Sequence, residues 1–528
     1  MPNFSSTFSQ RRRTSCALIA AGLVIAVVGP VLLADLPPLL DYPNHLARAV
    51  ALTARGTNMP AAQMYQPRWG IIPNLGSDVM LILLLKFLPP LAAGQAFLVL
   101  VLGAMIGGVI LYARAVFGRW TAWSLASPIA AYNGLFLMGF LNFCLATGLA
   151  LGVAAWWTAQ RQVRPNLAVV GAAVGLVVIW FCHLGGALFC VMLIAARELA
   201  WVVEERPCMP TTREALRRLL ALVLVCLPAI LLYFAADISA AETKARWFWN
   251  SKLWRTFMPA AAYYPLVDAA VALVLVAMLV VSALTRRLRV DRAGAAVAMV
   301  CVLVFVSAPF TAKSSAWIDV RFAMMVWLLL FACLAPRFEG TAGRVTMAVT
   351  LGALALKLGS IGVAWTRAQP EIAQVRAALT CAPKLSRILI ARTRSNPRKD
   401  PKHRRLFARV PVYSHLGALA LIDRGAFFPS MFTIKGQHPI AVRPPYDTLV
   451  KHIIQPPYLK TLFKTQSAAE LPGELTPFAA RFDFILLLDA SRQSAPLPPA
   501  LRIECDTGYA KLFRILPQFS RPRPLRSR

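Results

Sequence analysis

Residues 91–113 read LAAGQAFLVLVLGAMIGGVILYA, a run of 23 residues without a charged side chain. A helix of about 20 apolar residues crosses the ~30 Å hydrocarbon core of a bilayer. Blocks of similar character recur along the chain and end near Ala364. The 528 residues are 58% hydrophobic and 15% charged, with a mean hydropathy of +0.60, whereas about a quarter of the residues in soluble proteins are charged. The sequence therefore predicts a polytopic α-helical membrane protein.

About 11 transmembrane helices are predicted, because apolar blocks alternate with short connections. Their ranges are 16–34, 91–113, 120–134, 137–157, 166–181, 184–203, 216–234, 266–285, 293–310, 321–337 and 344–364. The first block has the order of a secretory signal, but Leu32-Leu33-Ala34 is a poor cleavage site, which favours an uncleaved signal anchor. Segment 78–90 is short and ends in Pro89-Pro90. We expect it to lie on or dip into the membrane interface rather than cross.

The net charge of +33 is concentrated in basic clusters between the apolar blocks. They include Arg11-Arg12-Arg13, Arg161 with Arg164, Arg217-Arg218, and Arg286-Arg287 with Arg289 and Arg292. Basic loops stay on the cytoplasmic side of a membrane. The N-terminus is therefore predicted to be cytoplasmic and the C-terminus periplasmic, in a bacterial inner (cytoplasmic) membrane. Membrane lipids are expected partners, while nucleic acid is excluded because no recognition motif accompanies the charge.

The chain divides into a transmembrane domain over residues 1–364 and a C-terminal extracytoplasmic α/β domain over residues 365–528. The tail contains 27 Lys and Arg against 10 Asp and Glu, and long domains cross membranes largely regardless of charge. Apolar runs at 386–391 and 484–488 predict buried strands, and 414–424 has helical periodicity. Cys381 and Cys505 are the two cysteines placed outside, where a disulfide can form.

The first outer loop, residues 35–90, begins DLPPLLDYPNHLARA. Long ordered loops are usually functional. A proline two residues after Asp41 suits the first turn of a helix, which places His45 and Arg48 in its first two turns. In one interpretation Asp41 caps this helix and His45 is solvated. In the other, Asp41 and His45 are catalytic groups, and Asp35 and Arg48 bind the substrate.

An enzyme outside the cytoplasm has no nucleotide supply, so its activated donors are lipid-linked phosphates. Transfer from such a donor needs a base for the acceptor hydroxyl and cations for the departing phosphate. Candidate substrate-binding residues lie in the predicted outer loops 235–265 and 311–321 and at one break between spans: Lys244, Arg246, Lys313, Asp319, Arg321 and His183. Cations beside aromatic residues are also typical of an interfacial belt. No spacing of His and Cys indicates a zinc site, and a divalent cation is left open as cofactor.

This layout resembles the GT-C superfamily of polyprenyl-phosphate-sugar-dependent membrane glycosyltransferases. The similarity rests on PPLLDYPNHLARA after the first span, an interfacial helix before the second, a pair of short spans turning at Tyr132-Asn133-Gly134, and an α/β domain after the last span. It implies a lipid-linked sugar donor, an envelope glycan or lipid acceptor, and Asp41 as the catalytic base. Many members have a second acid directly after the first, where this chain has Tyr42.

Two other classes of protein stay open. One is a transporter or flippase of lipid-linked saccharide, and the other is a non-catalytic envelope-assembly protein. Transporters show internal repeats and intramembrane charges. The predicted spans contain almost no charge and show no repeat, which favours the enzyme.

Overall fold

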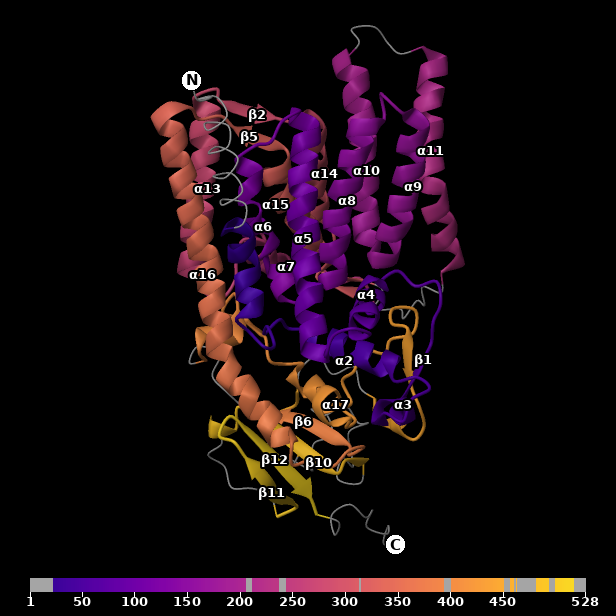
Figure 1. The fold of residues 1–528 in the computed structure, drawn as a ribbon, viewed down its shortest axis with the longest axis vertical. Helices are drawn as coiled ribbons and strands as arrows, with labels where there is room; N and C mark the ends of the chain where they lie inside the picture. Colours follow the sequence, from indigo (N-terminus) through magenta and orange to yellow (C-terminus); the bar gives the residue numbers. More distant parts are fainter. Residues whose placement is uncertain are drawn as a thin grey trace, which may run out of the picture.

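The computed structural model describes residues 22–205, 211–236, 244–312, 315–393, 400–450, 456–459, 462, 481–492 and 499–516. Helices run along the long axis of the molecule, and a small sheet covers one end (Figure 1). We call this the sheet end. The opposite end carries strands β2 (Leu288–Val290) and β5 (Leu334–Pro336), and we call it the loop end.

Seven of the described helices are long and apolar enough to cross a membrane. They are α5 (Pro90–Phe117), α8 (Leu141–Gln160), α9 (Pro165–Cys182), α10 (Leu184–Glu205), α11 (Thr212–Ala235), α13 (Pro265–Leu284) and α16 (Gly340–Leu379). Shorter helices of the bundle are Gly22–Leu32, α14 (Arg292–Ser307) and α15 (Ile318–Ala332). The predominantly helical class is confirmed, although seven rather than eleven described helices meet both criteria.

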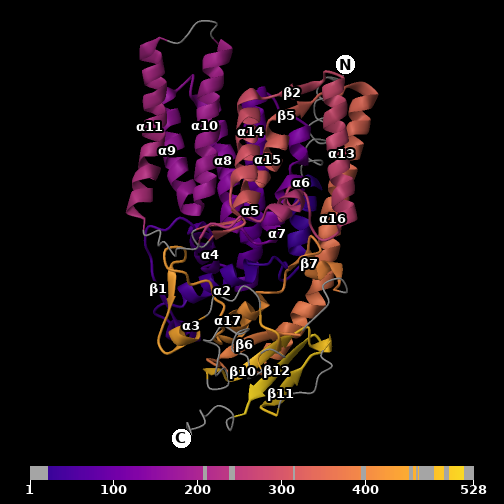
Figure 2. The same ribbon diagram turned by 180° about the vertical axis from the view of Figure 1, so that it is seen from behind.

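The continuous span predicted over residues 120–134 is wrong. Residues 118–140 lead from the loop end of α5 to the start of α8 as short pieces: η1 (Trp123–Ala126), α6 (Pro128–Ala131) and α7 (Gly134–Leu137) (Figures 1 and 2). The Asn133 side chain accepts hydrogen bonds from the backbone N–H groups of Leu135 and Phe136, both at 2.9 Å, and so caps α7. The segment has the apolar composition of a span, but its proline and this cap interrupt the helix.

Helix α16 has 40 residues and is therefore about 60 Å long at 1.5 Å per residue. The expected domain boundary at residue 364 falls inside this helix, which continues to Leu379 and packs on the sheet. A buried ion pair joins it to α13, with 2.5 Å between Lys357 Nζ and Asp268 Oδ1. The interior of the bundle is thus less free of charge than the sequence pattern indicates.

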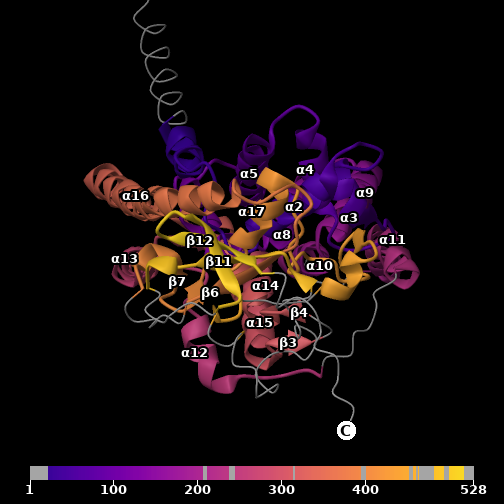
Figure 3. The same ribbon diagram turned by 90° about the horizontal axis from the view of Figure 1, so that it is seen from below.

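The sheet has the order β11-β12-β10-β6. Its strands are β6 (Ile388–Arg392), β10 (Phe484–Leu488), β11 (Leu501–Asp506) and β12 (Ala510–Ile515). Strand β10 pairs in parallel with β6 and antiparallel with β12, and all five of its residues are buried. Helix α17 (Leu419–Arg424) lies beside this sheet at the same end of the molecule (Figure 3).

The first outer loop and the tail are joined by a short sheet. Strand β1 (Tyr65–Pro67) pairs antiparallel with β9 (Ile440–Val442). The loop also contains α2 (Tyr42–Thr53) and α3 (Pro60–Met64), which lie with the tail at the sheet end (Figures 1 and 3). Segments that are far apart in sequence therefore form one layer over the helices.

The remaining short elements connect these parts. They are η2 (Trp249–Ser251), α12 (Lys252–Arg255), β3 (Thr311–Ala312), β4 (Ser315–Ala316), η4 (Lys402–Arg404), β7 (Arg405–Leu406), β8 (Val410–Pro411), η5 (Leu416–Ala418), η6 (Tyr446–Leu449) and η7 (Ala490–Arg492).

Helix α4 (Gly76–Leu85) occupies the segment expected to lie at the interface. Its ten residues give about 15 Å, too short to cross hydrocarbon. It packs against α2, α5 and α8 at the sheet end, and its Asp78 is fully buried.

Cys381 and Cys505 form a disulfide in the structure, with their Cα atoms 6.3 Å apart and a sequence separation of 124. Cys381 follows α16, and Cys505 lies in β11. The bond ties the end of the longest helix to an edge strand of the sheet.

Candidate functional site

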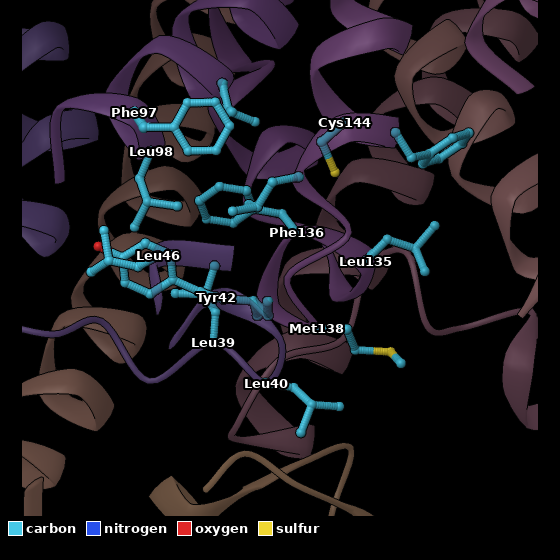
Figure 4. Packing of buried hydrophobic residues seen from close by; sticks show 14 of the residues in the cluster. Leu39, Leu40, Tyr42, Leu46, Phe97, Leu98, Leu135, Phe136, Met138 and Cys144 are labelled. Atoms are coloured by element: carbon cyan, nitrogen blue, oxygen red, sulfur yellow. The ribbon is translucent and has the colours of Figure 1, made fainter. Parts of the chain in front are cut away.

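Asp41 directly precedes α2 in the chain, between the buried residues Leu40 and Tyr42. Figure 4 shows the side chains of Leu39, Leu40, Tyr42 and Phe136 in the buried hydrophobic cluster. The backbone N–H of Asp41 donates to the Met138 carbonyl at 3.1 Å. Asp41 occupies the N-cap position, but its side chain makes no capping hydrogen bond. The capping interpretation is therefore wrong, and the carboxyl is available for other contacts.

Gly139 makes the close approach to Asp41 possible. Its φ of +84° lies in the region that glycine adopts at no steric cost. A Cβ atom here would lie 2.9 Å from the Asp41 Cβ and 2.8 Å from its backbone nitrogen. The turn between α7 and α8 thus fixes the position of the Asp41 backbone.

The Asp41 side chain is 16% exposed. Burial raises the pKa of this carboxyl to about 7, and the positive charge of Arg48 acts in the opposite direction. Near neutral pH the group can therefore both accept and release a proton, which a general base requires.

The histidine that contacts Asp41 is His415 of the tail, and sequence reasoning missed it. Its Nε2 lies 3.4 Å from Asp41 Oδ1, and its side chain is 2% exposed. Asn44 Nδ2 faces His415 Nδ1 at 3.3 Å and donates to the Ser430 carbonyl at 2.8 Å. The Phe432 ring packs edge-on against His415, with centroids 5.1 Å apart.

His45 and Arg48 serve a second buried cluster on α2. Arg48 pairs with Asp78 through two contacts of 2.6 and 3.0 Å, and its Nη2 lies 3.0 Å from His45 Nδ1. Because a guanidinium can only donate, His45 accepts at Nδ1. Burial and the Arg48 charge lower the pKa of His45 well below its usual value, and a hydrogen bond with the Gly139 backbone opposes them. Its proposed part in catalysis is untested, and its contacts are those of a neutral group that supports the turn.

The substrate-binding residues predicted in the two later loops lie in different environments. Asp319 is fully buried, with Arg255 Nη2 at 3.1 Å and Lys252 Nζ at 3.5 Å from its Oδ2. Asp319 therefore holds two cations of α12 rather than projecting into open space. Lys244 and Arg246 are exposed, and Lys313 lies outside the described residues.

Arg321 and His183 form one contact, as Arg321 Nη1 lies 3.2 Å from His183 Nε2. The guanidinium lies over Phe140, 5.5 Å from the ring centroid. Phe140 directly follows Gly139, so Arg321 and Asp41 pack against consecutive residues. Arg321 Nε is buried and has no hydrogen-bond partner among the described residues.

Asp35 is exposed, and its charge is felt by Arg376 of α16. Its charge therefore acts on α16 rather than on the Asp41 carboxyl. Within the described ranges, no group of three or more His, Cys, Asp and Glu side chains is placed to hold a metal ion.

A recess opens on the tail side of segment 411–415. It lies at the carboxyl ends of β6 and β10 and is lined by Arg392, Thr393, Asp400, Arg404, Arg405, Pro411, Tyr413, Ser414, Pro456, Leu488, Asp489 and Tyr509. Tyr413 and Ser414 therefore face the recess, whereas the next residue, His415, reaches Asp41. This recess is separate from the Asp41 cluster.

Comparison with known proteins shows the fold. No protein-family model matches the chain, and no curated protein matches it. The crystal structure of ArnT from Cupriavidus metallidurans bound to undecaprenyl phosphate is similar, with a TM-score of 0.50 and 10% identity. The match covers 97% of this chain and 99% of ArnT. The apo ArnT structure matches with a TM-score of 0.44 and 12% identity over 97% of this chain and 100% of ArnT. The chain thus has an ArnT-like fold, in agreement with the layout expected from the sequence.

Proposed function

We propose that this chain is a membrane glycosyltransferase that moves a sugar from a polyprenyl-phosphate-linked donor to an acceptor hydroxyl, with Asp41 as the base. The observation that carries the proposal is a nearly buried carboxyl with a pKa of about 7 at the start of α2 in an ArnT-like fold. A carboxylate with that pKa accepts a proton efficiently at physiological pH.

The reaction would proceed as a single displacement. Asp41 takes the proton of the acceptor hydroxyl while the acceptor oxygen bonds to the anomeric carbon of the donor sugar. The bond between that carbon and the phosphate oxygen breaks, and its electron pair leaves with the polyprenyl phosphate. Negative charge then develops on the phosphate, so a fixed cation nearby stabilises the transition state.

Arg321 is the best-placed described cation for this charge. It lies over Phe140, next to the glycine that abuts Asp41, and its Nε is buried without a hydrogen-bond partner in the described part of the chain. A guanidinium binds phosphate in a planar, bidentate manner. Lys252 and Arg255 are weaker candidates, because Asp319 already pairs with both.

The basic loops favour one orientation in the membrane. Arg161 and Arg164 lie in the connection from α8 to α9, and Arg286 and Arg287 directly precede β2. Figure 1 shows β2 at the loop end. Basic loops tend to remain in the cytoplasm, which supports an orientation with Asp41 and the sheet end outside. A donor with a polyprenyl tail reaches that site from the outer leaflet.

Asp41→Asn tests the function. The matched control is Asp447→Asn, which makes the same substitution at an exposed carboxyl of the tail. Each variant is expressed in a deletion strain, and envelope glycans and lipids are compared by mass spectrometry. We expect Asp41→Asn to lack the product while Asp447→Asn restores it. A normal product with Asp41→Asn would rule out the Asp base and favour the flippase or assembly protein.

A second measurement separates binding from turnover. Purified protein in lipid nanodiscs is titrated with undecaprenyl phosphate, the carrier bound in the ArnT structure. We expect Asp41→Asn to keep this binding, because a base acts on the acceptor in the transition state. Arg321→Gln should weaken binding at least tenfold, and unchanged binding would remove Arg321 from the donor site.

A further inference from the structure

The tail supplies a side chain to the Asp41 carboxyl. Asn44 lies three residues after Asp41 on the first turn of α2, and 371 residues separate it from His415. Asp41, Asn44 and His415 nevertheless form one line of polar contacts. We propose that His415 is a positioning residue which donates from Nε2–H to Asp41, and that Asn44 holds it in the tautomer able to do so. This inference rests on the proposed role of Asp41 as a base.

The orientation of the Asn44 amide determines the tautomer. Asn44 Oδ1 accepts from the backbone N–H of Phe432 at 3.0 Å, so the oxygen of the amide is identified. Its Nδ2 therefore faces the Ser430 carbonyl and His415 Nδ1. An amide NH₂ group can only donate, so His415 Nδ1 must be the acceptor. A neutral imidazole with an accepting Nδ1 carries its proton on Nε2, the atom that faces Asp41.

The surroundings keep His415 neutral. Its side chain is almost fully buried, with Phe432 packed against the ring. Burial lowers the pKa of His415 to about 4, so no charge is present on the ring at neutral pH. The ring therefore faces Asp41 as a neutral group, and the contact is not an ion pair.

The Nε2–Oδ1 distance of 3.4 Å is longer than the usual N–H···O hydrogen bond of about 2.7–3.2 Å. Such contacts in unliganded enzymes often tighten in the reacting complex. The ionised carboxylate accepts more strongly than the protonated one, so this donor favours ionisation of Asp41 and lowers its pKa.

Other charged groups near Asp41 act in defined directions. Arg48 on α2 also favours its ionised form, but Asp78 on α4 shares the charge of that guanidinium. His45 on the same helix is neutral because its pKa is depressed. His415 is therefore the donor from the tail that can adjust Asp41 without a change in net charge.

The test is the pH dependence of the initial rate in the full-length protein, with three variants. His415→Leu removes the donor at similar size. We expect the rise of the rate to move to higher pH by about one unit, which is a tenfold loss below the midpoint, with recovery at high pH. His415→Gln can still donate and should restore a profile close to wild type. Asn44→Asp should draw the histidine proton to Nδ1 and shift the rise in the same direction as His415→Leu.

A purely structural role predicts a different result. If His415→Leu lowers the rate equally at all pH values, or if His415→Gln behaves like His415→Leu, the positioning role is wrong. If His415→Leu does not fold, as judged by thermal unfolding, Asn44→Asp decides the question by the same pH criterion.

A readout without turnover separates this inference from the proposed function. The protonation of Asp41 is titrated by infrared difference spectra between each protein and its Asp41→Asn counterpart. We expect the carboxyl signal to titrate about one unit higher in His415→Leu than in wild type. An unshifted titration overturns the inference. A shifted titration in a protein whose turnover survives Asp41→Asn supports the inference and refutes the base.

Discussion

Two carboxylates of this molecule are contacted by the same short tail segment, with opposite results. Tyr413 donates to Glu371 of α16 at 2.8 Å, and His415, two residues later, faces Asp41 at 3.4 Å. The two side chains are almost equally exposed, at 15% for Glu371 and 16% for Asp41. Burial therefore does not distinguish them.

The difference lies in the partners. Burial would raise the pKa of Glu371, but hydrogen bonds from His403, Arg404 and Tyr413 outweigh it and the pKa is lowered. Arg404 also pairs with Asp489 at 2.8 Å, so this cluster is saturated with contacts. Among the described residues, the Asp41 carboxyl has His415 at 3.4 Å and the opposing charge of Arg48, and burial raises its pKa to about 7. The Glu371 carboxylate accepts several hydrogen bonds and holds the tail on α16. The Asp41 carboxylate has fewer donors and can take a proton.

The largest expected effect concerns turnover at Asp41. Asp41→Asn should lower the initial rate by about 10²–10⁴-fold, the usual contribution of a general base, while Glu371→Gln should leave the rate per folded molecule within about threefold. Initial rates are measured on protein normalised by size-exclusion chromatography. Comparable losses in both variants would erase the distinction between the two carboxylates.

The disulfide should contribute to stability without contributing to chemistry. Closing a loop of 124 residues stabilises a protein by roughly 3–5 kcal/mol in the chain-entropy estimate. Cys505→Ser should therefore lower the thermal midpoint strongly but leave the pH profile of the rate unchanged. Cys226→Ser, at a free cysteine of α11, is the control. Free thiols at Cys381 and Cys505 in the non-reduced wild-type protein would contradict the bond itself.

Stability should respond to pH with opposite signs at the two sites. Asp41 binds its proton more tightly in the folded state, so between about pH 4 and 7 stability falls as pH rises. Relative to Asp41→Asn, wild type should lose up to about 4 kcal/mol across that window, because each pKa unit is about 1.4 kcal/mol. The residual exposure of the side chain makes this an upper limit. Unfolding of both proteins at several pH values measures the effect, and parallel curves would contradict the raised pKa.

Glu371 should show the reverse dependence and a smaller loss. Its lowered pKa means that its stabilisation is present above the pKa of an unfolded glutamate and disappears as pH falls through the folded value. Glu371→Gln should cost about 2 kcal/mol at pH 7, since hydrogen bonds to charged groups contribute about that amount. Asp506→Asn breaks the exposed pair with Lys511 and should cost under ~1 kcal/mol. Equal losses in the two variants would mean that the Glu371 cluster adds nothing.

Most of the helices and the position of Asp41 could be predicted from the local sequence. Apolar blocks of membrane length needed no tertiary information, and Asp41 followed from its place after the first span. A continuous span was wrongly predicted over residues 120–134 because the composition is that of a span. Pro128 and the Asn133 cap interrupt the helix there. The role of Lys357 could not be predicted, because a single charge hardly changes the hydropathy of a long apolar block. In the structure Lys357 forms an ion pair with Asp268.

The parts of the site that sequence could not supply depend on distant contacts. His415 lies within a segment that predicted only a helix, and no local spacing connects it to Asp41. Asp319 was expected to meet substrate, but its role is set by Lys252 and Arg255 from another loop. The charge of a residue and its position in the sequence predicted which residues lie at the sheet end. The ion pairs and hydrogen bonds of the folded chain determine which of them are free to bind a substrate.

The pairing of β1 with β9 has a consequence for biosynthesis. Ribosomes add about 5–20 residues per second, and 371 residues separate Asn44 from His415, so the first outer loop waits roughly 20–70 s for its partners. Throughout that interval the exposed edge of β1 and the carboxyl of Asp41 lack the tail segments that cover them. Chains interrupted before residue 440 would lack β9 and leave β1 without its partner strand.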